Sequence, residues 1–426
     1  MKILLQNILI SDPHSPYNNQ HVDVLIEKGM IAQIGKYIST NDVTIISGTN
    51  FHASPGWMDL HAHFRDPGFE FKETIETGAN AAAQGGFTAV LLMPDTMPIV
   101  QSKSAIEYIL KRSQQLAVDI VPAGAITQDL KGKEMAELYD MHLAGAKAFT
   151  DAEHTIDHSG LLVRALLYAN NFEGKLHVRC EENSISDGGQ MNEGPMSTLL
   201  GLKGIPGLAE ELMIARTIYL AEYAAAPIHL MGVSTEKSVQ LIRDAKAKGL
   251  AITAAAHAYN LFWNDSMLAD FDTNYKVNPP LRSEDDRKAL LDAIADGTID
   301  AITSGHSPED IENKVVEFDL AAFGMIGLES AFALACSSDK FSAAQLVNAL
   351  SIQPRKIAGV EIPVIKAGEK ANLTIFDPTA KWTYNTTSIK SKSKNTPLLG
   401  KELTGKVIGI INKGKWVPNE DLGQNF

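Results

Sequence analysis

Short apolar runs at the two ends of the chain are separated by Gly, Asn, Asp and Ser. In the first 54 residues these runs lie at 3–10, 22–26, 30–34 and 43–46. Such punctuated runs are typical of a small antiparallel sheet. The same pattern of short apolar runs recurs after residue 369, at 371–376 and 407–413. The two chain ends are therefore expected to form one small β-sandwich.

Between these ends, apolar runs alternate with longer amphipathic stretches. Strand–helix alternation of this kind predicts a parallel sheet with crossover helices. About eight such units in roughly 250 residues match the size of a closed (β/α)8 barrel. Strands are expected at 88–93, 120–125, 146–150, 175–180, 228–233, 251–256 and 301–304, and helices at 74–84, 103–115, 209–224, 236–248 and 284–295. The predicted fold is thus α/β, with a TIM-type barrel over 55–368 and a composite sandwich from 1–54 and 369–426.

Composition narrows the class of protein. The 426 residues include 38 Lys and Arg against 51 Asp and Glu, a net charge of −13, and no basic block that would favour a nucleic-acid partner. No apolar run approaches the ~20 residues of a membrane span. The N-terminal segment is interpreted as a first strand rather than a signal peptide. Two cysteines, Cys180 and Cys336, fit a reducing compartment. A cytoplasmic protein is expected.

One motif carries candidate metal chemistry. Residues 55–68 read PGWMDLHAHFRDPG, in which His61 and His63 alternate along an expected strand. Their rings would point the same way, into the barrel mouth. Converging imidazoles suit a divalent metal. Taken alone, His-x-His is equally compatible with two polar strand residues that bind nothing.

Several further blocks make the chain resemble the dihydroorotases, in the amidohydrolase superfamily. The resemblance spans nearly the whole chain and lies in 55–68, KETIETGANAAAQGGFTAVLLMPDT at 72–96, AFTD at 148–151, CEENS at 180–184, 233–249, 275–302 and FGMIGLESAFAL at 323–334. It implies a metal-dependent (β/α) barrel with a sandwich built from both ends. It also implies the reversible closure of carbamoyl aspartate to dihydroorotate in pyrimidine synthesis, with one or two zinc ions.

The resemblance implies that this chain retains part of the family's metal site. His61 and His63 stand at the paired histidine positions, and Asp151 stands at the carboxylate position of bacterial relatives. Lys147 occupies the place where other branches use a carboxylated lysine. Because Lys147 and Asp151 have equal parity on an expected strand, both are expected to face inward.

Three other family positions have changed. Arg179 stands where relatives have a histidine ligand, Gly232 stands at the next ligand, and Gly305 replaces the catalytic Asp. An arginine cannot ligate zinc, because its guanidinium stays protonated and offers no lone pair. A glycine offers no ligand atom and cannot move a proton. Proton transfer at this strand end would require His306 to turn inward.

The expected substrate pocket is also altered. Arg65 and Asn278 remain. Asp95 and Glu309 stand where the family has an Asn and a His that bind the substrate carboxylate. At ~4 Å, each carboxylate would repel a substrate carboxylate by about 1 kcal/mol in water-like surroundings, and by more at lower dielectric. Arg65 alone would not offset both.

Two arrangements of the metal region remain open. His61, His63 and Asp151 could hold a single zinc ion. Alternatively, Arg179 pairs with Asp151 and replaces the metal with a salt bridge. Among displaced histidines, His177 lies about 6.6 Å deeper along its strand and His229 has the wrong parity, which leaves His257 as a further option.

These changes lead to the hypothesis of a dihydroorotase homologue that has lost the reaction. By analogy with inactive subunits of some pyrimidine pathways, it would serve as a structural partner of aspartate carbamoyltransferase. The alternative is an active cyclic amidohydrolase with at most one zinc ion, acting on dihydroorotate or on another cyclic amide. A homo-oligomer, most simply a dimer, is expected in either case.

Overall fold

A computed structural model describes residues 2–419 of the chain. Eight parallel strands pair in the order β6–β7–β8–β9–β10–β13–β14–β15. A parallel bridge between Ala62 and His306 brings the last strand back to the first, so the ring closes. The predicted (β/α) barrel is therefore confirmed. Its strands are β6 (Trp57–Ala62), β7 (Phe87–Leu92), β8 (Asp119–Gly124), β9 (Ala148–Phe149), β10 (Lys175–Arg179), β13 (Ile228–Met231), β14 (Ile252–His257) and β15 (Ala301–Thr303).

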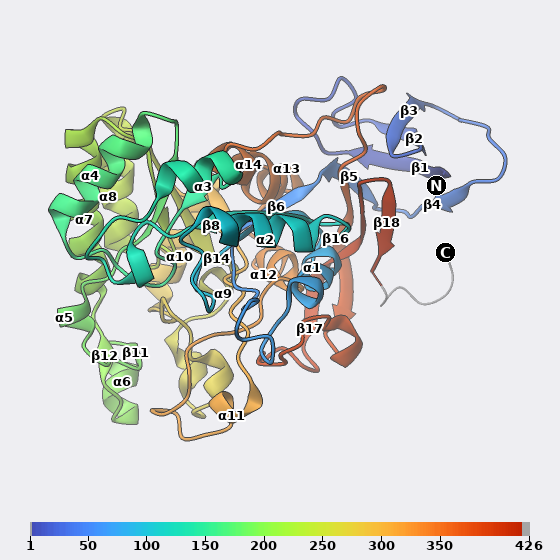
Figure 1. Cartoon of the computed structure of the whole chain (residues 1–426). Helices are drawn as coiled ribbons and strands as arrows, with labels where there is room; N and C mark the ends of the chain where they lie inside the picture. Colours follow the sequence, from blue (N-terminus) through green and yellow to red (C-terminus); the bar gives the residue numbers. More distant parts are fainter. Residues whose placement is uncertain (1, 420–426) are drawn as a thin grey trace.

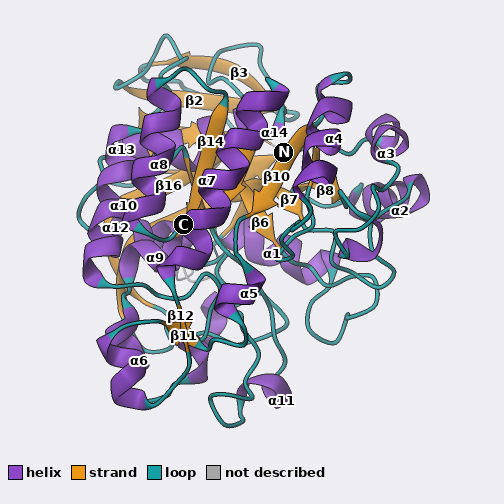
Figure 2. Cartoon of the chain, turned by 90° about the vertical axis from the view of Figure 1, so that its left-hand side faces the viewer, coloured by secondary structure: helices purple, strands orange, loops and turns teal. Residues whose placement is uncertain are grey.

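Helices cover the outside of this ring (Figure 2). Every residue of β6 and β7 is buried, because helices pack on one face and barrel side chains fill the other. Several of the helices begin at a residue whose side chain caps them. Thr74, for example, accepts a hydrogen bond from the Thr77 backbone N–H at the start of α1. The longer helices are α1 (Ile75–Gln84), α2 (Lys103–Ser113), α3 (Leu138–Ala144), α4 (Ser159–Asn170), α7 (Gly207–Ala224), α8 (Glu236–Ala247) and α10 (Glu284–Asp296).

Shorter elements fill the connections. Between β10 and α7 the chain makes an excursion that carries a two-stranded sheet. This excursion contains α5 (Asn183–Ser186), β11 (Met191–Asn192), α6 (Pro195–Leu200) and β12 (Gly204–Ile205). The remaining short helices are α9 (Ala258–Phe262), α11 (Ile311–Lys314), α12 (Ala331–Cys336), α13 (Ala343–Val347) and α14 (Gln353–Ala358).

The two chain ends share one sheet beside the barrel, where the blue and red ends of the chain lie together (Figure 1). Strand β5 joins them, since it pairs parallel with β1 and antiparallel with β16. The sheet buries its own apolar cluster, which includes Ile3, Ile10, Leu373 and Ile411. None of the helices in residues 2–419 is both long and apolar enough to span a membrane. The strands are β1 (Lys2–Ile10), β2 (His21–Glu27), β3 (Met30–Gly35), β4 (Thr44–Ile46), β5 (His52–Pro55), β16 (Leu373–Thr383), β17 (Glu402–Asn412) and β18 (Lys415–Pro418).

Candidate functional site

Two histidine rings meet at the carboxyl end of β6. The Nε2 atoms of His61 and His63 are 3.2 Å apart, and both side chains are buried. The Nδ1 atom of His63 lies 2.7 Å from an Asp95 carboxylate oxygen, which fixes the ring with Nε2 facing His61. A carboxylate behind a histidine is a common way of orienting a metal ligand.

A third donor comes from the loop after β9. The Glu153 Oε1 atom lies 2.7 Å from His61 Nε2 and 3.5 Å from His63 Nε2. These three donor atoms lie within 4.8 Å of one another. Among residues 2–419, no other group of three His, Cys, Asp or Glu side chains meets that spacing.

The donor set fits one divalent ion. Bonds of about 2.0–2.1 Å in tetrahedral geometry place neighbouring donor atoms about 3.3 Å apart. The three observed separations of 2.7, 3.2 and 3.5 Å bracket that value. Two imidazoles and a carboxylate are also the donor types that zinc accepts. His61, His63 and Glu153 therefore could hold a single zinc-like ion.

Arg179 is buried at the barrel mouth, where its guanidinium lies beside the Gly232 carbonyl. Its Nη2 atom donates to the Glu181 carboxylate at 2.8 Å and to Asn278 Oδ1 at 2.7 Å. Its Nε atom lies 4.0 Å from Glu153 Oε2. Burial alone would lower the pKa of Arg179, but Glu181 and Glu153 raise it, so this buried guanidinium stays charged.

A side chain at either of the two glycines at this end would require its neighbours to shift. Gly232 and Gly305 both have a φ of +59°, in the left-handed region. A Cβ atom on Gly232 would lie 2.9 Å from Arg179 Nη1 and 3.1 Å from His257 Nε2. A Cβ atom on Gly305 would lie 2.6 Å from Tyr259 Cε1 and 3.0 Å from His257 Cγ. Arg179, His257 and Tyr259 therefore fill the space that side chains at these two positions would need.

On the other side of the mouth, Arg65 is held by two acidic side chains. Its Nη1 atom donates to Asp95 Oδ2 at 2.8 Å, and its Nη2 atom donates to Glu309 Oε1 at 3.1 Å. Lys72 Nζ donates to the second Glu309 oxygen at 2.5 Å. The cationic charge of Arg65 is thus already balanced within the chain.

These contacts set the protonation states. Burial alone would raise the pKa of Asp95, but His63 and Arg65 lower it to about 2. Burial alone would lower the pKa of His63, but Asp95 and Glu153 raise it to about 9. A metal ion at His63 Nε2 would have to displace a proton, because only neutral imidazole offers a lone pair.

Comparison with known proteins identifies the family. A family model described as dihydro-orotase-like matches residues 53–238. A dihydroorotase from Acetivibrio thermocellus is 40% identical over 425 residues, covering 99% of this chain and 100% of the relative. A dihydroorotase from Pelotomaculum thermopropionicum is 41% identical over 421 residues, covering 98% of each chain. This chain belongs to the dihydroorotase family.

Solved structures of more distant proteins share the fold of this dihydroorotase-family chain. An L-hydantoinase from Arthrobacter aurescens superposes with a TM-score of 0.85 at 22% identity, covering 98% of this chain and 96% of that chain. A dihydropyrimidinase from Brevibacillus agri gives a TM-score of 0.83 at 22% identity, with 98% and 95% covered. At this identity the likeness concerns the fold alone.

Two further residues that were expected at the metal site, Asp151 and Lys147, do not join the histidines. Asp151 is buried, but its carboxylate accepts the backbone N–H groups of Ile126 and Thr127, both at 2.9 Å, and the Thr127 hydroxyl. Lys147 is exposed. The expectation that Lys147 faces inward was wrong, because β9 has only two residues and strand alternation does not extend across 147–151.

The predicted salt bridge between Arg179 and Asp151 was also wrong. Glu181 and Glu153 are the acidic partners of Arg179 instead. Sequence reasoning missed Glu153 altogether. The one available signal was an acidic residue two positions after Asp151, and only the path of the loop shows that it reaches His61.

Some of the remaining predicted site residues lie at the barrel mouth and others do not. His306 turns away from the mouth, since its Nδ1 accepts the Gly327 backbone N–H at 3.2 Å and its Nε2 lies 3.4 Å from Glu73. His257 does reach the mouth, with its ring centroid 4.8 Å from that of His61. Asn278 lies beside Arg179 and donates to Glu181 at 3.2 Å. Of the expected substrate residues, Arg65, Asp95 and Glu309 lie together and Asn278 lies across the mouth.

Proposed function

We propose that this dihydroorotase-family protein does not run the family's reaction at an ordinary rate. The observation that carries the proposal is the filled space at Gly232 and Gly305. No carboxylate is present at residue 305 to move a proton, and Tyr259 and His257 fill its place. General acid–base catalysis typically contributes about 10²–10⁴-fold to a rate, so its loss alone is severe.

The state of Arg65 supports the same proposal. A substrate carboxylate would have to compete with Asp95 and Glu309 for the one guanidinium. Releasing Arg65 would take one of two cationic partners from each carboxylate, leaving Asp95 with His63 and Glu309 with Lys72, and this loss costs free energy in a partly buried site. The pocket thus disfavours an anionic substrate such as dihydroorotate.

An activity assay tests this proposal. Purified protein with added zinc should be assayed for carbamoyl aspartate cyclisation and for dihydroorotate hydrolysis. The Acetivibrio thermocellus relative, prepared in the same way, serves as the positive control. Turnover near that of the control would refute the proposal, and turnover indistinguishable from buffer would support it.

The fit of His61, His63 and Glu153 to one ion favours a second candidate function. In this alternative the chain is a hydrolase with a single zinc ion held by those three residues. A bound zinc ion would polarise a carbonyl group and lower the pKa of bound water. Asp95 and Glu309 would then suit a neutral or cationic cyclic amide better than an anionic one. Hydrolysis of such an amide, lost in a His61→Ala/His63→Ala variant, would establish this alternative.

A structural role in pyrimidine synthesis completes the leading proposal. By analogy with pathways that contain an inactive dihydroorotase-like subunit, we propose aspartate carbamoyltransferase as the partner. The chain alone is proposed to be a homodimer. Light scattering of the chain, with and without the carbamoyltransferase of the same organism, tests both points. A monomer that forms no complex at micromolar concentrations would contradict them.

A further inference from the structure

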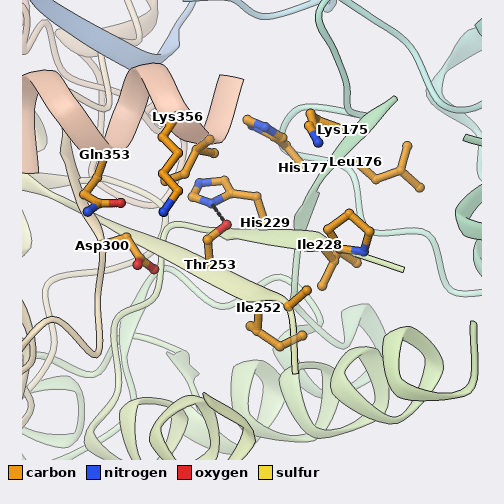
Figure 3. Close-up of a pocket in the computed structure, with 13 residues that line it drawn as sticks. Lys175, Leu176, His177, Ile228, His229, Ile252, Thr253, Asp300, Gln353 and Lys356 are labelled. Carbon is orange, nitrogen blue, oxygen red and sulfur yellow. Dashed lines mark hydrogen bonds between the residues drawn. The ribbon is translucent and has the colours of Figure 1, made fainter. Parts of the chain in front are cut away.

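A second cavity lies at the opposite end of the barrel from the histidine–glutamate group. It has a volume of about 340 Å³ and is lined by the first residues of β10, β13 and β14, by Asp300 and by α14. Gln353 and Lys356 approach it from α14, and the His177 and His229 rings stand between the strands (Figure 3). Cavities of about 300–1,000 Å³ with few polar groups are typical of small-molecule sites.

Two buried imidazoles in the cavity wall have three ring nitrogens without hydrogen-bond partners among the described residues. His177 and His229 are register neighbours on β10 and β13, with ring centroids 4.6 Å apart. They are 0% and 3% exposed. Neither nitrogen of His177 has a partner among the described residues, and Nε2 of His229 has none either. Only His229 Nδ1 is satisfied, by the Thr253 hydroxyl at 3.0 Å. Leaving buried polar atoms unpaired costs free energy, which a bound group that pairs with them would recover.

Two ammonium groups at the cavity are also free to bind. Among residues 2–419, neither Lys175 nor Lys356 takes part in an ion pair. Lys356 is exposed, which places its charge on the solvent side of the cavity. The acidic residue there, Asp300, is already held by Lys246 at 2.7 Å and by the Ala254 backbone N–H at 2.8 Å. The free charge lining the cavity is therefore positive.

We propose that this cavity binds a small organic anion, a heterocycle bearing a carboxylate or phosphate, with its anionic group on Lys175 and Lys356 and its ring on His177 and His229. The ring would carry both a hydrogen-bond donor and an acceptor, because a neutral imidazole offers one of each. Burial lowers the pKa of His177 to about 3, which keeps that ring neutral. A metal site fits less well, since the cavity offers two imidazoles but no third donor within reach among the described residues.

Calorimetric titration tests this site with three probes. Imidazole-4-carboxylate carries both the ring and the anion, whereas imidazole and inorganic phosphate carry one part each. The combined probe is expected to bind more tightly than either part. Lys356→Met keeps the aliphatic stem but removes the charge, and should raise the dissociation constant for imidazole-4-carboxylate about tenfold or more. His177→Phe should weaken that probe while leaving phosphate binding unchanged.

Two control variants locate the binding. Lys133→Met removes an exposed lysine between β8 and α3 that does not line the cavity, and Arg65→Met alters the opposite barrel end. Both should leave the affinity for imidazole-4-carboxylate unchanged. Because Lys356 is exposed, its variant should fold normally even if His177→Phe does not. The proposal is overturned if no probe binds, or if the Lys356→Met variant binds imidazole-4-carboxylate as tightly as the unaltered chain. Binding that disappears in Arg65→Met instead would place the ligand at the barrel mouth.

Discussion

At the scale of single residues, acidic side chains reshape the barrel mouth. Asp95 accepts hydrogen bonds from both His63 and Arg65. One carboxylate therefore links the histidine–glutamate group to the residues expected to bind substrate. Glu153 supplies the third donor that Asp151 does not supply. Arg179 brings a fixed positive charge within 4.0 Å of Glu153. A metal ion here would share its carboxylate with a buried cation.

Metal retention should distinguish the two acidic residues. We expect Glu153→Gln to lose zinc on dialysis, because an amide oxygen is a weaker ligand than a carboxylate. Asp151→Asn should retain as much zinc as the unaltered chain, because Asp151 faces Ile126 and Thr127 rather than the histidines. Metal analysis after dialysis, with parallel unfolding curves as a check on folding, measures this. Loss of zinc in Asp151→Asn alone would restore Asp151 as the ligand.

An aspartate at position 305 should destabilise the protein. In Gly305→Asp, a side chain must enter at φ +59° against Tyr259 and His257. Left-handed backbone strain and overpacking together should lower the free energy of unfolding by about 2–4 kcal/mol. Urea unfolding measures the loss. A Gly305→Asp protein as stable as the unaltered chain would show that the mouth has more room than described.

At the scale of elements, α7 fixes two loops of the mouth through one buried side chain. Glu210 accepts the backbone N–H groups of Ser234 and Thr235 at 2.9 and 3.1 Å, and also the Ser234 hydroxyl. Arg282, in the loop before α10, lies 3.9 Å from the same carboxylate. The loop that contains Gly232 and the loop that contains Asn278 are therefore both anchored to α7.

Removing this anchor should destabilise the protein. Glu210→Ala would leave two backbone N–H groups and the Ser234 hydroxyl without their acceptor and would remove the acidic neighbour of the buried Arg282. The expected cost is about 3 kcal/mol or more in unfolding free energy. Glu222→Ala, at an exposed position on the same helix, should change it by less than about 0.5 kcal/mol. Chemical denaturation of both variants makes the comparison. Equal effects at the two positions would contradict the anchoring role.

The elements were predictable from the sequence where the signal was local. The expected helix at 236–248 matches α8, and the expected strand at 175–180 matches β10 to within one residue, because periodicity and caps are encoded within each segment. The site was predictable only in part. The convergence of His61 and His63 follows from side-chain alternation along β6. The strand expected at 146–150 is only the two-residue β9, however, and the path of the loop after β9 brings Glu153 rather than Asp151 to the two histidines.

At the scale of the whole molecule, the barrel and the terminal sheet depend on each other. Strand β5 leads directly into β6, which carries His61, and it pairs with β16 from the far end of the chain. Apolar side chains from both ends, including Ile10 and Ile375, form the sheet's shared core. The segment that positions the histidines is thus secured by the last part of the chain.

Truncation tests this dependence. A chain ending at residue 368 would lose β16–β18, which would leave β5 as an open edge and expose the shared apolar core. We expect it to aggregate and to show no cooperative thermal transition. A chain ending at residue 419 keeps these strands and should unfold cooperatively. Calorimetry of both chains gives the answer, and a cooperative transition in the shorter chain would mean that the barrel folds alone.

The most direct test of the central claim is the kcat/KM for dihydroorotate hydrolysis by the zinc-loaded protein. It should be compared with that of the Acetivibrio thermocellus relative under identical conditions. The filled space at Gly305 and the balanced charge of Arg65 predict a value lower by about 10⁴-fold or more. A value within about tenfold of the relative's would contradict the claim and would mean that another group moves the proton.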